Sequence, residues 1–475
     1  MDTSRRFPAL TVAATSLGFA VVQLDVTIVN VALPRIGGDL GASVTSLQWI
    51  VDAYTLTFAV LLLSAGALSD RLGARAAYVA GFALFALASS MCGLAPDACS
   101  LIAARALQGV GAALLVPSSL ALLNAACDGN PSWRARAVGF WTAAGGASIA
   151  AGPLIGAMLL GAFGWRSIFL VNVPFCALAA LAAMRWLREL GPGRAGRAFD
   201  VGGQMLVMVT LTALVATIIS ASRGSVDVAE IAAGFVVALL GAIVFCAVEA
   251  RAPAPMLPLA LFRRPGFGRA MLFGVIVNLT YYGIVFVLSL YLQQVRRYAA
   301  LDAALAYLPL TATFIVSNVA SGTLIARLGT RLPMVAGALV GGIGFALLAR
   351  LDAASAFTAM LAPFVLIPFG MGLAVPAMTT LTLSSVERRA SGTATGALNA
   401  ARQVGGALGV AVFGGLVAGD RIAAGLREAA CIAAALMIGA AVIAVGRRSA
   451  ARPDRGARDA VASSRVLQRQ CTRIR

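Results

Sequence analysis

The sequence predicts an all-α polytopic membrane protein, built as two bundles of six transmembrane helices with two further transmembrane helices inserted between them. Three observations support this fold class. The 475 residues are 60% hydrophobic and 12% charged, and the mean hydropathy is +0.90, whereas soluble domains carry about 25% charged residues. Apolar stretches long enough to cross a bilayer recur along the chain, and two motifs of the first half recur in the second half.

Apolar stretches of about 20 residues, the length that crosses a bilayer as a helix, occur about fourteen times. They fall near residues 9–34, 46–68, 75–95, 99–124, 135–161, 167–187, 201–221, 228–248, 267–292, 303–326, 332–350, 355–383, 390–417 and 428–446. The first stretch is too long for the apolar core of a signal peptide, so we expect an uncleaved first span.

The placement of arginine predicts the orientation. All 37 basic residues are arginine, and with the N-terminus inside they concentrate in the segments expected on the cytoplasmic side. Both termini are therefore expected in the cytoplasm, and the chain in the cytoplasmic (inner) membrane. These loops and a basic tail account for the net charge of +18. We expect the tail to contact anionic lipid, and we expect no nucleic-acid partner.

Two repeated motifs indicate two homologous halves. "GALSDRLGAR" (66–75) recurs as "GTLIARLGTR" (322–331), and "GPLIG" (152–156) recurs as "GGALG" (405–409) at nearly the same spacing. Binding sites in such proteins lie between the repeats, near the middle of the bilayer. The predicted organisation is an N-terminal six-helix bundle (1–190), a linker with two extra transmembrane helices (191–266), a C-terminal six-helix bundle (267–446) and a disordered basic cytoplasmic tail (447–475).

The residue inventory excludes several kinds of chemistry. The chain has no lysine and no histidine, which removes the Walker A phosphate loop, histidine metal sites and lysine Schiff bases. The seven cysteines form no CxxC motif; Cys92 and Cys99 flank a short outer loop and could pair, although small apolar packing is favoured. We therefore expect no catalytic residue, no metal and no cofactor, and any proton chemistry must use aspartate or glutamate.

Six motifs together resemble the major facilitator superfamily, specifically its fourteen-span drug:proton antiporter branch of multidrug and methylenomycin-resistance exporters. They cover most of the chain's first half and read "LDVTIVNVALP" (24–34), "LQWIVDAYTLTFA" (47–59), "GALSDRLGAR", "LIAARALQGVGAALLVPSSLALL" (101–123), "GPLIG" and "GWRSIFLVNVP" (164–174). The resemblance implies the major facilitator fold and proton-coupled export of lipophilic drugs or antibiotics. Ala74 stands where a second basic residue is common, which is a mild departure.

Two ionisable residues inside spans, Asp25 and Arg105, are the predicted proton-coupling site, because charges there are costly and usually mark function. Asp25 lies about 13 Å and Arg105 about 9 Å below the same end of the molecule, at 1.5 Å per helical residue. We expect them to share a cavity. The guanidinium would favour ionised Asp25, and desolvation by a lipophilic drug would favour its neutral form, so that drug and proton compete. The alternative is a permanent ion pair that only fixes helix packing.

A larger set of polar, aromatic and methionine side chains is predicted to line the substrate cavity. It comprises Asn30, Asp52, Tyr54, Gln108, Asn278, Tyr281, Tyr282, Asn318, Met371, Asn399, Arg402 and Gln403, with Met378 as a further adaptable apolar contact. Packing is the alternative for each aromatic and methionine. For Asp52 the alternative is stabilisation by the dipole at a helix N-terminus. No carboxylate lies deep within spans nine to thirteen, which favours a neutral or monocationic drug over a dication.

Two motifs are predicted to act in conformational change. The resemblance implies a charged latch on a cytoplasmic turn, formed by Gly66, Asp70, Arg71, Gly73 and Arg75. "GPLIG" offers Gly152 and Gly156 for close helix packing and Pro153 for a bend. Simple packing is the alternative for this second motif.

Three function classes remain open on the sequence. The first is a proton-coupled exporter of lipophilic drugs, acting by alternating access with protons, membrane lipid and a small lipophilic substrate as partners, and with a monomer as the default state. The second is a carrier of the same fold for a specific metabolite, either an exporter or a proton symporter. The third is a non-transporter such as an intramembrane enzyme, against which the sequence offers no DDxxD cluster, no histidine and no nucleophile elbow.

Overall fold

The computed structural model describes residues 3–127, 131–188, 200–221, 227–252, 255, 257, 259–352, 355–386, 391–417 and 421–445. Within these residues the chain is almost entirely helical and contains no strand. A single compact unit covers Met1–Ala444. The predicted disordered tail, 447–475, lies outside the described residues.

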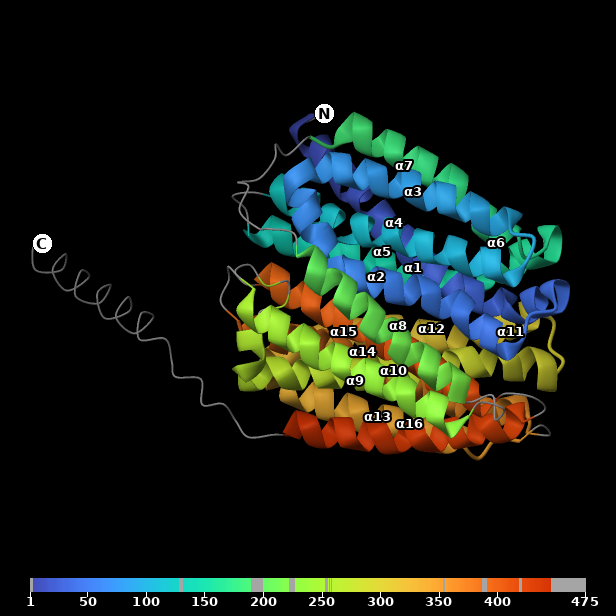
Figure 1. The fold of residues 1–475 in the computed structure, drawn as a ribbon. Helices are drawn as coiled ribbons and strands as arrows, with labels where there is room; N and C mark the ends of the chain where they lie inside the picture. The colour runs from blue at the N-terminus through green and yellow to red at the C-terminus, as the bar shows by residue number, and fades with distance from the viewer. Residues whose placement is uncertain are drawn as a thin grey trace, which may run out of the picture. The chain divides into compact units, whose positions relative to one another are not determined.

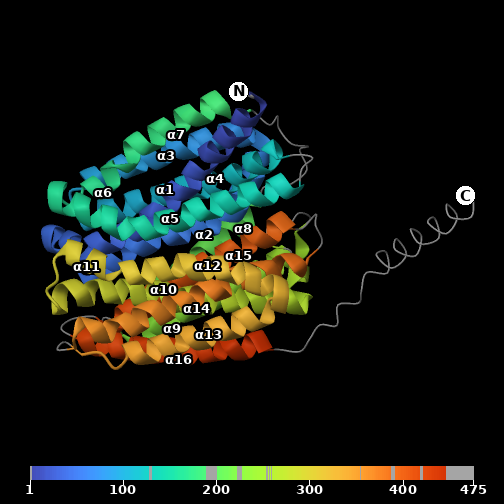
Figure 2. The same cartoon turned by 180° about the vertical axis from the view of Figure 1, so that it is seen from behind.

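The first half of the compact unit contains seven helices that pack side by side in the upper part of Figures 1 and 2. They are α1 (Thr3–Leu40), α2 (Val44–Leu72), α3 (Ala74–Leu94), α4 (Ala98–Ala126), α5 (Pro131–Phe163), α6 (Ser167–Leu170) and α7 (Asn172–Trp186). The closest pairings join α2 to α4, α1 to α5 and α3 to both α4 and α7.

The second half, in the lower part of Figures 1 and 2, follows two additional helices. The additional helices are α8 (Val201–Ala221) and α9 (Val228–Arg251). The second half contains η1 (Leu259–Arg263), α10 (Pro265–Leu290), η2 (Tyr291–Val295), α11 (Ala300–Ala306), α12 (Leu308–Leu328), α13 (Arg331–Leu348), α14 (Phe357–Ser384), α15 (Ser391–Leu416) and α16 (Ile422–Val445).

Helix α8 lies against both halves. Its side chains Val215 and Ile219 are buried in one cluster with Leu56 of α2 and with Ala407 and Ala411 of α15. Helix α9 packs on the outside of α8 and leaves most of its apolar side chains exposed. An apolar helix surface of this kind is suited to contact with lipid.

The structure confirms a multi-pass, all-helical membrane protein. Among the described residues, twelve helical segments are long and apolar enough to span a bilayer, and the bent pair Ala137–Ile149 and Ala151–Phe163 of α5 makes a thirteenth. Helix α15 is outside this count, although it has 26 residues and matches the predicted span 390–417. The total of fourteen spans therefore stays a prediction.

The prediction that the first span ends near Pro34 is wrong for the helix, because α1 continues to Leu40. Hydropathy marks where the apolar stretch ends and not where the helix ends. Arg35 and Asp39 form a pair at 3.2 Å across one turn of this extension. The helix then ends at Gly41, which has φ +59°, and the Ala42 backbone N–H donates to the Gly37 carbonyl at 2.9 Å, as in a Schellman motif.

The cytoplasmic turn predicted between the second and third spans is a single residue. Helix α2 includes Gly66, Asp70 and Arg71, and α3 starts at Ala74, so that only Gly73, with φ +92°, separates them. Glycine alone adopts such a φ without strain. Arg71 is exposed, and the Asp70 side chain lies outside the described residues, so the proposed latch role stays a prediction. The Arg75 guanidinium donates to the Leu187 carbonyl at 3.2 Å.

Two other predicted spans are interrupted. The span 167–187 is divided at Val171 into α6 and α7, and the span 303–326 is divided at Tyr307 into α11 and α12. The segment between α9 and α10 contains the 3-10 helix η1, which has five residues.

The "GPLIG" motif bends α5 and packs it against α1. The two parts of α5 meet at 40° between Ile149 and Ala151, next to the carbonyl that the Pro153 ring crowds four residues earlier. A Cβ on Gly152 would overlap the Thr27 side chain, and one on Gly156 would lie 2.8 Å from Ile28 Cγ1. Bending and close packing therefore occur together here.

Side-chain hydrogen bonds join the halves at the outer end, which we define as the end where α1 finishes and α2 begins. Gln48 Nε2 of α2 donates to the Val410 and Ala411 carbonyls of α15 at 3.2 and 3.0 Å. From α10 and η2, the Ser289 hydroxyl donates to the Asn30 carbonyl of α1, and Gln293 Nε2 donates to the Val31 carbonyl at 3.0 Å. The two halves are therefore in contact, and hydrogen-bonded, at this end.

Candidate functional site

Local sequence places Arg105 on α4 one turn before a close contact with α2. Asp97 caps α4, because its carboxylate accepts the Ser100 backbone N–H at 2.8 Å. A Cβ on Gly109 would lie 2.5 Å from the Tyr54 carbonyl oxygen, so only glycine permits this approach of α4 to α2. Arg105, one turn earlier, is thereby held beside the α2 backbone, and Arg105 Nε donates to the Ile50 carbonyl at 3.0 Å.

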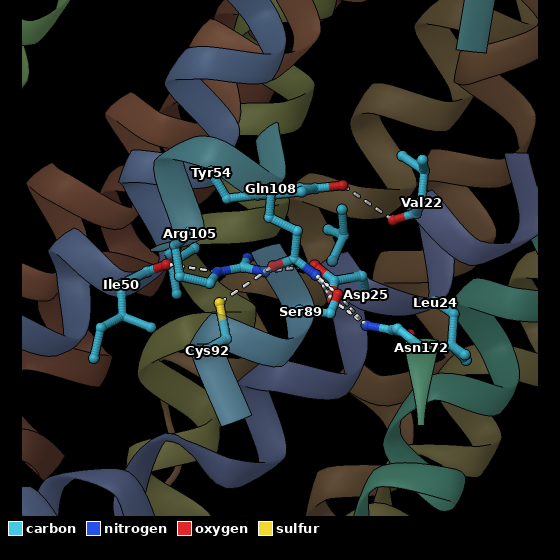
Figure 3. A network of polar contacts seen from close by, with 12 residues as sticks. Val22, Leu24, Asp25, Ile50, Tyr54, Ser89, Cys92, Arg105, Gln108 and Asn172 are labelled. Atoms are coloured by element: carbon cyan, nitrogen blue, oxygen red, sulfur yellow. Dashed lines mark hydrogen bonds and ion pairs between the residues drawn. The ribbon is translucent and has the colours of Figure 1, made fainter. Parts of the chain in front are cut away.

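Asp25 and Arg105 form a buried ion pair (Figure 3). Arg105 Nη1 lies 2.5 Å from Asp25 Oδ2, and the two residues are 1% and 0% exposed. Gln108 Nε2 and Asn172 Nδ2 donate to Asp25 Oδ1 at 2.8 and 3.0 Å. The carboxylate therefore accepts from three side chains of α4 and α7, an arrangement that suits its ionised form.

The neighbours of the pair complete its hydrogen bonding. Gln108 Oε1 accepts from Arg105 Nη1 at 2.6 Å, and Ser89 Oγ lies 2.9 Å from Gln108 Nε2. The Tyr54 ring covers the guanidinium, with Arg105 Cζ 4.3 Å from the ring centroid. Aromatic faces attract cations, so the Tyr54 ring stabilises the Arg105 guanidinium (Figure 3).

A small cavity lies between the two halves. It is lined from α1, α2, α4, α10 and α15 by Val26, Val29, Asn30, Val51, Tyr54, Thr55, Arg105, Tyr282, Gln403, Gly406 and Val410. Its wall is thus apolar with a few polar side chains, which is typical of small-molecule sites. Five residues predicted from the sequence are among them, namely Asn30, Tyr54, Arg105, Tyr282 and Gln403.

Other predicted cavity residues lie outside this lining. Gln108 belongs to the Asp25 network, and Asn278 and Asn318 donate to the carbonyls of Gly274 and Phe314 in their own helices, at 2.8 and 2.9 Å. The Tyr281 ring packs edge-on against Tyr282, with centroids 5.4 Å apart. Asn399 is half-buried, and Met371 and Met378 are buried in the second half's core.

Asp52 is buried and 0% exposed, and neither carboxylate oxygen has a hydrogen-bond partner among the described residues. It lies on α2 between Gln48 and Leu56, one turn from each, on the flank that faces α15 and α8. The dipole explanation is wrong: Ser43 caps α2, so Asp52 lies beyond the first turn, where the dipole acts.

Arg402 lies near the middle of α15, next to Gln403 and one turn before Gly406. Its buried Nε has no hydrogen-bond partner in the described part of the chain. Its aliphatic stem passes Gly274, where an added Cβ would lie 3.5 Å from Arg402 Cγ. A Cβ on Gly406 would lie 3.2 Å from Tyr282 Cδ2, so the Tyr282 ring packs against α15 one turn beyond Arg402.

Sequence reasoning missed several functional candidates. Asn172 and Ser89 contact Asp25 or its partner Gln108, yet neither received a role. Asn172 is a polar residue inside an otherwise apolar stretch, and this is the signal that identified Asp25 and could have identified Asn172. Gln48 was also missed; it is likewise a buried amide close to the end of a span.

Comparison with known proteins decides the family. The family model described as Major Facilitator Superfamily matches residues 15–410. The chain belongs to the major facilitator superfamily. This major facilitator is similar to the methylenomycin A resistance protein of Bacillus subtilis. The two sequences are 36% identical over an alignment that covers 85% of this chain and 86% of the relative. It is also 36% identical to the Streptomyces coelicolor protein of the same name, over 85% of this chain and 84% of that relative. It is 35% identical to the tetracenomycin C resistance and export protein of Streptomyces glaucescens, over 86% of this chain and 76% of that relative.

In this major facilitator, the geometry links the cavity to a titratable group. Arg105 is both a lining residue and the partner of Asp25. A movement of Arg105 would therefore change both the wall of the cavity and the buried ion pair.

Proposed function

We propose that this protein is a proton-coupled efflux transporter that exports lipophilic drugs or antibiotics across the cytoplasmic membrane by alternating access. Membership of the superfamily supports a carrier rather than an enzyme. The names of its relatives, which are resistance and export proteins, support drug efflux. The proposal places both termini in the cytoplasm and requires a proton gradient but no other cofactor. It treats the working unit as a monomer in contact with lipid.

The Asp25–Arg105 pair carries the proposal. In the present arrangement Asp25 is inaccessible and is not part of the cavity lining, whereas its partner Arg105 is. A lipophilic drug that displaces Arg105 would leave Asp25 desolvated and without its cation, and both changes favour proton uptake. Release of the proton on the cytoplasmic side would restore the pair. Proton and drug would then occupy the site in alternation, as exchange requires.

The contacts at the outer end supply the conformational part of the cycle. The Gln48, Ser289 and Gln293 hydrogen bonds join the halves beyond the cavity. A net hydrogen bond contributes only about 0.5–1.5 kcal/mol, so these contacts can break and re-form during transport. Opening this end would give the cavity access to the outside.

The test uses inverted membrane vesicles, in which the cytoplasmic face is outside. A panel of lipophilic drugs is added, and uptake driven by an acidic lumen is measured for the wild type, Asp25→Asn and Asp39→Asn. Asp39 is an exposed carboxylate on the same helix and serves as the matched control. We expect proton-driven uptake by the wild type and Asp39→Asn and loss of it in Asp25→Asn. Unchanged uptake in Asp25→Asn would remove the coupling role.

Right-side-out vesicles test the competing possibility of an importer. A symporter would accumulate its substrate there under an inward proton gradient, whereas an exporter would not. Accumulation of a metabolite in these vesicles, together with no drug uptake in the inverted ones, would replace the efflux proposal.

A further inference from the structure

In the second half, Arg402 does not itself line the cavity but adjoins the lining residue Gln403, and no acid among the described residues of this half pairs with it. Within the described residues of this half, the acidic side chains are Asp302, Asp352 and Glu428. Asp302 and Asp352 are exposed near the outer end, and Glu428 pairs with Arg421 at 2.7 Å. None of them contacts Arg402, whose buried Nε has no acceptor in the part of the chain that the structure describes.

The first half does not supply the missing charge either. Asp25 is already matched by Arg105 and by two amide donors. Asp52 is outside the cavity lining, and neither of its carboxylate oxygens has a hydrogen-bond partner among the described residues, so it does not bond to Arg402. Arg402 is half-buried as a whole, but its Nε is buried without an acceptor, and a buried polar group that makes no hydrogen bond is costly. A ligand that supplies an acceptor would therefore be favoured here.

The neighbours of Arg402 have donors to offer. Gln403 adjoins it on α15, and Tyr282 of α10 packs against Gly406, one turn further along α15; both Gln403 and Tyr282 line the cavity. A glutamine amide and a tyrosine hydroxyl can each donate to an oxyanion. The remaining wall near them is apolar, with Val26, Val29 and Val410. This combination of one cation, two neutral donors and a valine-lined wall fits an organic anion with an apolar body.

We propose that the substrate is a lipophilic carboxylic acid, bound as its anion with the carboxylate against Arg402, Gln403 and Tyr282. The inference rests on the proposed efflux function and adds the chemical class of the cargo. It replaces the expectation, made from the sequence, that the drug is neutral or monocationic. That expectation rested on the lack of carboxylates in spans nine to thirteen and took no account of Arg402. A planar guanidinium binds a carboxylate through two parallel hydrogen bonds, and these are stronger than hydrogen bonds between neutral groups.

The charge of the cargo has a consequence for energetics. Export of a monoanion moves negative charge outward, and the entry of a proton moves positive charge inward. Both movements carry current in the same direction, so a membrane potential that is negative inside favours both. Transport of the anion would therefore respond to potential even without a pH gradient.

The first experiment measures binding to the purified full-length protein in detergent. The probes are pyrenebutyrate, its uncharged amide pyrenebutyramide, and the lipophilic cation tetraphenylphosphonium. We expect pyrenebutyrate to bind about tenfold or more tightly than the amide, because a charge-assisted hydrogen bond is about twice as strong as a neutral one. Arg402→Gln should abolish this difference, and Arg402→Lys should retain part of it.

The matched control is Arg350→Gln, which removes an exposed arginine from the end of α13 in the same half. It should leave the preference for the acid unchanged. If Arg402→Gln fails to fold, Gln403→Leu provides a second variant and should reduce binding of the acid more than binding of the amide. Equal binding of acid and amide by the wild type, or tighter binding of the cation, would overturn the proposal, as would no binding of either pyrene probe.

Transport assays separate this inference from the proposed function. In inverted vesicles, proton-driven uptake of neutral or cationic drugs that depends on Asp25 but shows no preference for pyrenebutyrate would sustain efflux and overturn the anion site. Selective, Arg402-dependent binding of pyrenebutyrate without any proton-driven transport would do the reverse. Pyrenebutyrate uptake that is driven by potential alone and lost in Arg402→Gln would support both.

Discussion

Gln48 on α2 donates its side-chain amide to the backbone carbonyl of Val410 on α15, at 3.2 Å, and so ties the two halves together. The same nitrogen lies 3.0 Å from the Ala411 carbonyl, and Gln48 is 1% exposed. The neighbouring position on α15, Gly414, has no side chain, and a Cβ there would lie 2.5 Å from Gln48 Nε2. This contact depends on a buried amide opposite a glycine.

Replacing Gln48 by Leu should favour opening of the outer end. The change removes both hydrogen bonds, each worth about 0.5–1.5 kcal/mol. In a background without the seven native cysteines, Thr55→Cys in the cavity lining reports opening through its reaction with an impermeant thiol reagent added at the outer face. We expect the rate to rise roughly tenfold with Gln48→Leu. Gln294→Leu, at an exposed glutamine of η2, should not change it; an unchanged rate in Gln48→Leu would show that the contact does not hold this end closed.

Removal of one member of the Asp25–Arg105 pair should destabilise the fold more than removal of both. A buried charge without its partner costs about 3–5 kcal/mol, so Asp25→Asn and Arg105→Gln should each lower the thermal unfolding temperature in detergent. The double variant should recover part of the loss but no proton-driven transport. Additive losses in the double variant would mean that the two side chains do not stabilise each other, contrary to their 2.5 Å contact.

A methyl group on Gly109 should separate α4 from α2. Because the added Cβ would lie 2.5 Å from the Tyr54 carbonyl oxygen, Gly109→Ala should cost about 1–3 kcal/mol, which is typical of overpacking. It should also reduce proton-driven transport, since Arg105 would move with α4. Gly161→Ala is the control, because no atom lies within 4 Å of a Cβ at that position. Equal stability of the Gly109→Ala and Gly161→Ala variants would show that α4 and α2 are not in close contact at Gly109.

Gln204 should anchor α8 to α2 without taking part in binding. Gln204 Nε2 donates to the Val60 carbonyl at 2.7 Å, and the Ser64 hydroxyl donates to Gln204 Oε1. Gln204→Leu should therefore lower stability by about 1–3 kcal/mol, as two hydrogen bonds are lost, while the number of protons exchanged per drug stays the same. Thr212→Val, at an exposed residue of α8, should be neutral. A change in the number of protons exchanged per drug in Gln204→Leu would show that α8 takes part in proton coupling.

Sequence patterns predicted the helices and the position of Asp25 beside Arg105, because charged residues within apolar stretches are rare and visible. The residues at which the helices begin and end were predicted less well from the sequence. Hydropathy does not report the extension of α1 to Leu40 or the reduction of a turn to Gly73. These helix ends depend on the backbone conformation of single glycine residues. Hydropathy indicates only whether a segment lies in lipid or in water.

The other polar residues of the site were predicted less well because their partners are distant in sequence or within their own helix. Asn172 contacts Asp25 across 147 residues, and no local pattern encodes that contact. The side-chain amides of Asn278 and Asn318 donate to the backbone carbonyls four residues earlier in their own helices. A polar residue in a span therefore need not face a cavity. Arg402 was predicted to line the cavity but lies outside its lining, next to Gln403, and the missing acceptor at its Nε is visible only in three dimensions.

The position of α8 makes the two flanks of the molecule unequal. Val215 and Ile219 fill the seam between α2 and α15, so lipid tails and hydrophobic solutes dissolved in the bilayer are shut out of the molecule there. On the other flank, where α5 meets α11 and α12, no such additional helix covers the seam in the described chain. The internal repeat alone would make the two seams equivalent, and the inserted helices cover one of them. A solute that entered the molecule sideways from the lipid would therefore have to cross the seam of α5 with α11 and α12.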